Sequence, residues 1–194
     1  MTLGGCATRP ALQQDKLIQI TQRQTTRAEV EQLLGKPDDE VTGSNGRTLI
    51  VYQEYERDWR LLKSEIGLDF LTAFFLFSEE GVLEKKLISE TGTAVVWKGR
   101  VATFGRPISE EQLQKLKLNE TRYEDVTSIL GPPLVERLTL DGEIIREWIF
   151  SREATFSKSG SQTFTASFDY DMDVLRDFVI EDDLPADKKK VATE

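Results

Sequence analysis

One fourteen-residue stretch of this chain occurs twice in similar form. Residues 25–38 read TTRAEVEQLLGKPD, and residues 121–134 read TRYEDVTSILGPPL. Matched positions, such as Leu34 and Leu130, lie 96 residues apart. Self-similarity at a fixed offset is typical of a repeated structural unit, so two copies of one fold are predicted.

Each repeated stretch is predicted to be a helix with a defined start and end. Thr26-x-x-Glu29 and Thr121-x-x-Glu124 match the capping box that begins a helix. Apolar residues then follow at the i, i+3, i+4 spacing of a buried stripe, and a glycine and a proline end each helix. These residues are Val30, Leu33, Leu34, Gly35 and Pro37 in the first copy, and Val126, Ile129, Leu130, Gly131 and Pro133 in the second. A shorter amphipathic segment precedes each helix, the second with a Ser109-x-x-Gln112 capping box.

After each helix the apolar period changes to two, which indicates strands. The predicted strands are 47–55, 68–77 and a third from Val82, then 143–151, 162–168 and a third from Val174. The fold class is therefore predicted to be α+β, with two tandem ααβββ units, each of two short helices packed on an antiparallel sheet. At the third strand the offset falls to 92, which indicates a shorter hairpin in the second copy.

This pattern divides the chain into four predicted segments. They are a lipobox remnant and tether (1–14), a first unit (15–105), a second unit (106–181) and a charged C-terminal tail (182–194). Residues 93–104 have no counterpart in the second copy, and either an extra strand or a bridge between the units would account for them.

The composition limits the classes of function. The chain has a formal net charge of −9, no histidine and one cysteine. Nucleic-acid binding is not expected, because phosphates require clustered Lys and Arg and the short run 188–190 is interpreted as a solvated terminus. Without histidine the usual general base and the commonest metal ligand are missing, so no enzyme, catalytic residue, metal or cofactor is predicted. The longest apolar run, 68–77, is half the length of a membrane-spanning helix.

The single cysteine is predicted to carry lipid. Leu3-Gly4-Gly5-Cys6 resembles a bacterial lipobox, in which small residues let the signal peptidase reach the backbone. The charged start and apolar stretch of a signal do not precede it, so the chain is expected to begin within the signal. A chance cysteine in an N-terminal segment is the alternative. Ala7, in place of the aspartate that retains lipoproteins at the inner membrane, points by this resemblance to the outer membrane.

The order of helices and strands, the T…V…LG.P helix and the turn Gly81-Val82-Leu83 resemble the SmpA/OmlA (BamE-like) lipoprotein domain. One member of that family supports outer-membrane β-barrel assembly. The tandem arrangement is similar to the β-lactamase inhibitor proteins, in which two units form one concave sheet. The resemblance covers residues 15–90 and 108–180. Asp173 replaces the turn glycine, so the second copy is expected to have a different turn.

Four aromatic residues are candidates for partner binding: Tyr52, Trp59, Trp97 and Trp148. Core packing is the alternative for those on predicted strands, and the matched positions of Tyr52 and Trp148 favour it. Trp59 lies between two arginines, a setting that suits an interface. Residues 169–173 (DYDMD) resemble the start of a calcium loop but lack its later glycine and glutamate, so an acidic turn is predicted.

These features predict a lipid-anchored lipoprotein of the bacterial outer membrane that faces the periplasm. It is expected to act as a non-enzymatic protein-binding or scaffold module in outer-membrane assembly or maintenance. Its partners would be a protein and, through lipid on Cys6, the membrane. The first alternative is an inhibitor of a secreted or periplasmic enzyme, although a diffusible inhibitor gains nothing from an anchor. The second is a hydrolase or other enzyme, against which the missing histidine and catalytic motifs argue.

Overall fold

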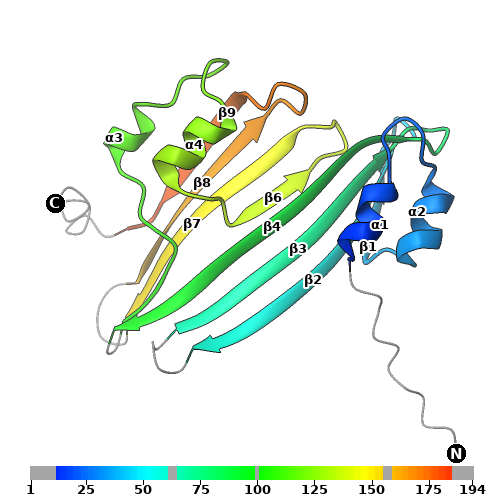
Figure 1. Ribbon diagram of the computed structural model, residues 1–194. Helices are drawn as coiled ribbons and strands as arrows, with labels where there is room; N and C mark the ends of the chain where they lie inside the picture. The colour runs from blue at the N-terminus through cyan, green and yellow to red at the C-terminus, as the bar shows by residue number, and fades with distance from the viewer. Residues whose placement is uncertain (1–11, 61–64, 99–100, 155–158, 185–194) are drawn as a thin grey trace, which may run out of the picture. The chain divides into compact units, whose positions relative to one another are not determined.

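The computed structural model describes residues 12–60, 65–98, 101–154 and 159–184 (Figure 1). The helices are α1 (Gln14–Gln19), α2 (Arg27–Leu34), α3 (Glu110–Leu113) and α4 (Tyr123–Leu130). The strands are β1 (Asp39–Thr42), β2 (Thr48–Arg60), β3 (Glu65–Phe77), β4 (Leu83–Lys98), β5 (Val101–Phe104), β6 (Val135–Leu138), β7 (Ile144–Ala154), β8 (Gly160–Phe168) and β9 (Leu175–Asp182).

The predicted α+β fold class of two tandem ααβββ units is wrong. The structure is mostly β, with 49% strand and 17% helix, and its helices are short. Each pair of helices is followed first by a four-residue strand, β1 or β6, that was not predicted. Every residue of β1 is exposed, so it shows no apolar alternation. Residues 93–98 and 101–104 are also strand, the first group at the end of β4 and the second as β5.

The chain forms two compact units that interleave along the sequence. Unit 1 contains the residues up to Glu54 together with Leu71–Ile88, and unit 2 contains Tyr55–Phe70 and the chain from Ser89 onward. Strands β2, β3 and β4 therefore each contribute to both units. The sequence-based segments differ from this division because a repeat in sequence does not reveal where long strands pass from one unit to the next.

Unit 1 has a core of aliphatic and aromatic side chains between its helices and the strands β2 and β3. Ile20, Val30, Ile50, Phe75 and Phe77 are fully buried in this cluster. The predicted strand within 68–77 is confirmed, and Ala73 to Phe77 are buried at every position. Burial on both faces explains why this stretch is a continuous apolar run rather than an alternating one.

Unit 2 packs α3 and α4 on one face of β7–β9, which Figure 1 shows at the upper left. In β8 every second side chain is buried: Gln162, Phe164, Ala166 and Phe168. Each large side chain removed from water in this way stabilises the fold by about 1.5–3 kcal/mol. The alternate residues of β8 point to the opposite face and are only partly buried.

The helix starts differ between the repeats. Thr26 begins α2 with the predicted capping box, because its hydroxyl accepts from Glu29 N and Glu29 bonds Thr26 N. The matching prediction for Thr121 is wrong. The N-cap of α4 is Arg122, which lies 96 residues after Thr26, and the Thr121 hydroxyl instead accepts from Lys117 N at 2.8 Å.

Candidate functional site

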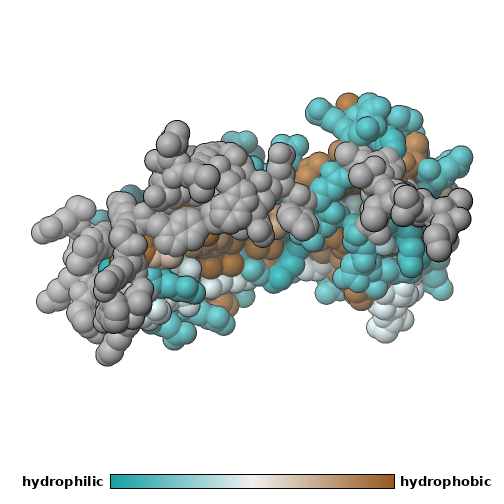
Figure 2. All heavy atoms as spheres, turned by 90° about the horizontal axis from the view of Figure 1, so that it is seen from below, coloured by the Kyte–Doolittle hydropathy of each residue, from teal (hydrophilic) through white to brown (hydrophobic). Residues whose placement is uncertain are grey.

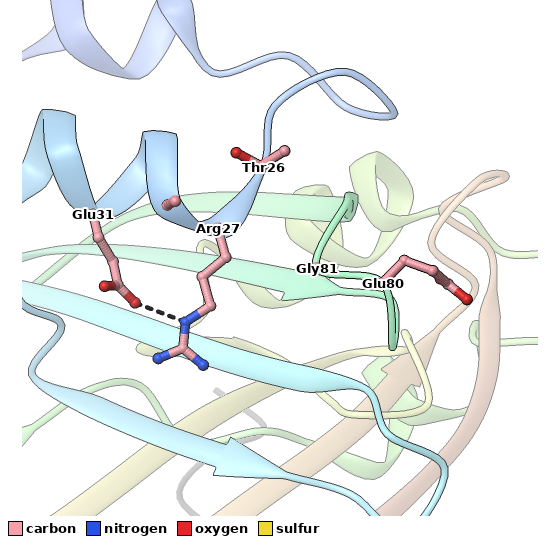
Figure 3. Close-up of a pocket in the computed structure, with 6 residues that line it drawn as sticks. Thr26, Arg27, Glu31, Glu80 and Gly81 are labelled. Atoms are coloured by element: carbon pink, nitrogen blue, oxygen red, sulfur yellow. Dashed lines mark hydrogen bonds and ion pairs between the residues drawn. The ribbon is translucent and has the colours of Figure 1, made fainter.

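A shallow surface pocket of about 360 Å³ lies beside the start of α2 in unit 1 (Figure 3). Its lining residues are Thr26, Arg27, Ala28, Glu31, Glu80 and Gly81. Two elements form it: the first turn of α2 and the turn between β3 and β4. Arg27 N donates to Gly81 O at 3.0 Å and joins these elements. Gly81 has φ +76°, a conformation that glycine adopts without strain.

The charged groups of this pocket are engaged with one another. Arg27 donates Nε to Glu31 at 2.7 Å, the contact drawn in Figure 3, and both Nη atoms to Glu40 at 2.7 and 2.8 Å. These bonds, chiefly the one to Glu40, raise the pKa of Arg27 and lower that of Glu40. A hydrogen bond from the Ser78 hydroxyl lowers the pKa of Glu80. The guanidinium is thus committed to protein carboxylates rather than presented to a ligand.

The corresponding place in unit 2 holds a buried arginine that sequence reasoning missed. Arg146 of β7 is 4% exposed and donates Nε to Glu136 and Nη1 to Asp173, both at 2.7 Å. Its guanidinium carbon lies 3.5 Å from the ring centroid of Tyr123 and 4.6 Å from that of Phe168. A charge this deep is stable only when it is paired and hydrogen-bonded, and here it also gains from the aromatic faces.

The surroundings of Tyr123 are partly buried and charged. Burial, followed by the negative charge of Glu136, raises the pKa of Tyr123 above its usual range. The second oxygen of Glu136 accepts from the Ser89 hydroxyl at 2.9 Å. One signal in the sequence could have revealed this cluster: Arg146 occupies a core-facing strand position that is Ile50 in the first repeat.

Two of the predicted partner-binding aromatics lie in the core. Tyr52 is 4% exposed, and its hydroxyl donates to Gly35 O at 2.8 Å. Trp148 is 5% exposed, and its Nε1 donates to Gly131 O at 2.8 Å. Each ring therefore ties a strand to the C-terminal end of its helix. The packing role that the matched positions favoured accounts for both residues, and neither ring is accessible to a partner in the folded unit.

The other predicted site residues are only partly placed. Trp59 lies in β2, and Trp97 lies in β4 opposite Ala102 of β5. The side chains of both tryptophans are outside the described part of the structure. Cys6, the predicted lipidation site, is also outside the described residues.

The acidic stretch 169–173 forms the turn between β8 and β9. One oxygen of Asp169 accepts from Asp171 N and Met172 N, and the other accepts from Arg176 at 2.8 Å. These bonds, chiefly that from Arg176, lower the pKa of Asp169. The turn is one residue longer than its counterpart, since Asp169 N bonds Val174 O where Ser78 N bonds Val82 O. The expected difference in turns is confirmed. No cluster of His, Cys, Asp or Glu suited to a metal ion occurs among the described residues.

The face of the unit 2 sheet opposite α3 and α4 presents a regular array of side chains, here called the outer face. Register places Ile145, Ser167 and Asp177 in one row, Glu147, Thr165 and Val179 in the next, and Ile149, Thr163 and Glu181 in a third. On β6, Val135 and Arg137 share this face, and on β7 Ser151 and Glu153 continue it. The α3–α4 segment packs on the other side, through the bond from Trp148 to Gly131 and the Tyr123–Phe168 ring contact.

Comparisons with known proteins found no match among protein-family models, curated proteins or solved structures. No helix in the described ranges has both the length and the apolar composition needed to cross a membrane.

Proposed function

We propose that the protein is a non-enzymatic protein-binding module of the bacterial cell envelope, held at the outer membrane by lipid on Cys6. The outer face of unit 2 carries this proposal. It is a broad sheet surface that no described helix of unit 2 covers, and strands β6–β9 hold it in fixed register. A rigid, partly apolar sheet surface suits association with another protein.

The side chains of the face support the same proposal. Ile145, Ile149 and Thr165 are partly exposed, and Val179 is 57% exposed. The outer face thus combines aliphatic side chains with hydroxyls and carboxylates. A mixture of this kind is usual for non-obligate interfaces, which are about as apolar as the rest of a protein surface. On the surface seen from below, Figure 2 likewise shows hydrophobic residues in several groups among hydrophilic ones, without marking the outer face.

The arrangement of the charged side chains in the two units favours a binding function over catalysis. The arginines of the two places, Arg27 and Arg146, are held in ion pairs that join secondary-structure elements. The resemblance of Leu3-Gly4-Gly5-Cys6 to a lipobox supports the anchor, and the resemblance to BamE-like domains supports a role in outer-membrane assembly or maintenance.

The proposal is tested in intact cells with the gene and its native upstream sequence. A photo-crosslinking residue replaces Thr165 on the outer face or, as a control, Glu143 in the β6–β7 turn. Capture of a specific envelope protein from position 165, together with membrane fractionation that is lost in Cys6→Ser, is the expected result. Recovery of β-barrel assembly components would support the assembly role, whereas capture of a soluble periplasmic enzyme with loss of its activity would replace it with inhibition. A Cys6→Ser variant that still fractionates with membranes would overturn the anchor.

A further inference from the structure

The outer face is unevenly charged. Among the described residues of β6–β9, the outer face carries one cation, Arg137, and four carboxylates. Arg137 lies 2.6 Å from Glu147 and neutralises it. The remaining three, Glu153, Asp177 and Glu181, are exposed, and none forms an ion pair with a cation of the described residues. The face therefore has a surplus of negative charge, in a chain whose formal net charge is −9.

The centre of the face is suited to close contact. Thr163, Thr165 and Ser167 stand in line along β8, flanked by the isoleucines of β7 and by Val179 of β9. These side chains are short, and the β-branched ones have few accessible rotamers. Little side-chain entropy is lost when another surface covers them, so such a patch can contribute to binding without first becoming ordered.

The edges of the sheets are less suited to a partner than the face is. On β9, Asp177 Oδ1 accepts from the N–H of Phe178 at 2.9 Å. On β1, Asp39 Oδ1 accepts from the N–H of Glu40 at 2.8 Å. An added strand would have to displace these bonds and approach the aspartates themselves, and charged edges of this kind deter strand addition. This favours docking on the face.

We propose that the outer face docks a protein surface with clustered Lys and Arg side chains, placed opposite Glu153, Asp177 and Glu181. The inference rests on the proposed binding function and adds the chemistry of the partner. Charges at the rim chiefly set the rate of association and the choice of partner, while the hydroxyl and aliphatic centre is covered.

The test uses the whole chain and a defined probe, a Lys- and Arg-rich helical peptide, with a Glu-substituted peptide of equal length as its counterpart. Amide chemical shifts locate binding, and fluorescence anisotropy measures affinity. The charge-reversal variant is E153K/E181K. The matched control, E111K/E143K, makes the same change of charge at exposed positions on α3 and in the β6–β7 turn. Amide spectra of both variants establish that they remain folded.

The expected result is that the basic peptide shifts amides of β7–β9, and that E153K/E181K weakens binding on the order of tenfold while the control changes it little. Binding should also weaken with added salt. Equal binding of the acidic peptide, shifts confined to other surfaces, or equal loss in the two variants would overturn the proposal. Concentration-dependent shifts on this face without peptide would assign it to a second copy of the chain and overturn it as well. An envelope partner captured in cells from a site other than position 165 would leave the proposed function standing and refute the basic docking face alone.

Discussion

Arg146 occupies the strand position in the second repeat that Ile50 occupies in the first. Both side chains are buried, at 4% and 0% exposure, yet one is charged and the other apolar. The difference is compensated locally. In unit 2, Glu136 pairs with Arg146, and the ring of Tyr123 lies over the guanidinium of Arg146. The residues of unit 1 that match Glu136 and Tyr123 are Glu40 and Arg27, which pair with each other. Both repeats therefore have an arginine paired with the carboxylate at this position. The arginine comes from helix α2 in unit 1 and from strand β7 in unit 2.

Replacing Arg146 alone should be severe. Arg146→Met leaves the carboxylate of Glu136, whose side chain is 11% exposed, without its cation. Breaking a buried pair in this way costs about 3–5 kcal/mol. Urea unfolding followed by circular dichroism measures the loss. The double variant Arg146→Met/Glu136→Gln also removes the unpaired carboxylate, so it should recover part of the lost stability. A double variant no more stable than Arg146→Met alone would contradict this account.

Among the elements, the strongest local patterns were predictable and the weakest were not. The capping box at Thr26 and the strand within 68–77 follow from side-chain chemistry and apolar content. Strands β1 and β6 are only four residues long, so backbone pairing with β2 and β7 defines them rather than any apolar pattern. Pairing between distant segments has no signature in a single sequence. The predicted fold class was overturned by the high strand content and the shortness of the helices.

The candidate site was predictable only in part, for a similar reason. Aromatic type and matched spacing identified Tyr52 and Trp148 as residues of interest, and the packing alternative described their position. The outer face could not be foreseen, because its rows depend on the register of β7, β8 and β9. A shift of one residue would have exchanged its threonines for the buried phenylalanines.

Edge strands give a second prediction. If Asp39 and Asp177 protect the edges by accepting the N–H of the next residue, Asp39→Ala/Asp177→Ala should increase self-association. Sedimentation velocity over a range of concentrations measures it. Glu111→Ala/Glu143→Ala removes the same charge away from the edges, so dimerisation of both variants to the same extent would attribute the effect to net charge alone.

The free energy of unfolding of the whole molecule should be highest at intermediate pH. Carboxyl groups cause its decrease in acid, and Tyr123 causes its decrease in alkali. Among the described residues, hydrogen bonds lower the pKa of the carboxyl groups of Glu29, Glu40, Glu80 and Asp169. Their stabilisation is present above the ordinary carboxyl pKa and is lost as the pH falls below about 4. Tyr123 acts in the opposite direction. Its pKa is raised in the folded state, so its contribution is complete below pH 10 and is lost as the pH rises further.

Thermal unfolding between pH 3 and pH 11 measures both limits. The melting temperature should fall below about pH 4 and again above about pH 10. Tyr123→Phe should flatten the alkaline fall and leave the acid one unchanged, and Asp169→Asn should reduce the acid one. An alkaline fall of the same size in Tyr123→Phe would exclude this tyrosine as its cause.

The paired arginine lies on α2 in unit 1 and on β7 in unit 2. This difference affects whether each helix packs on its own strands during folding. Two similar units in one chain risk exchanging segments while they fold, as tandem repeats do. If α2 docked on β6 and β7, Arg27 and Arg146 would compete for Glu136. If α4 docked on β1 and β2, Glu40 would face Tyr123 and an isoleucine with no cation. Either hybrid would leave a charged group without its matched partner, so we expect each helix to recognise its own strands by charge.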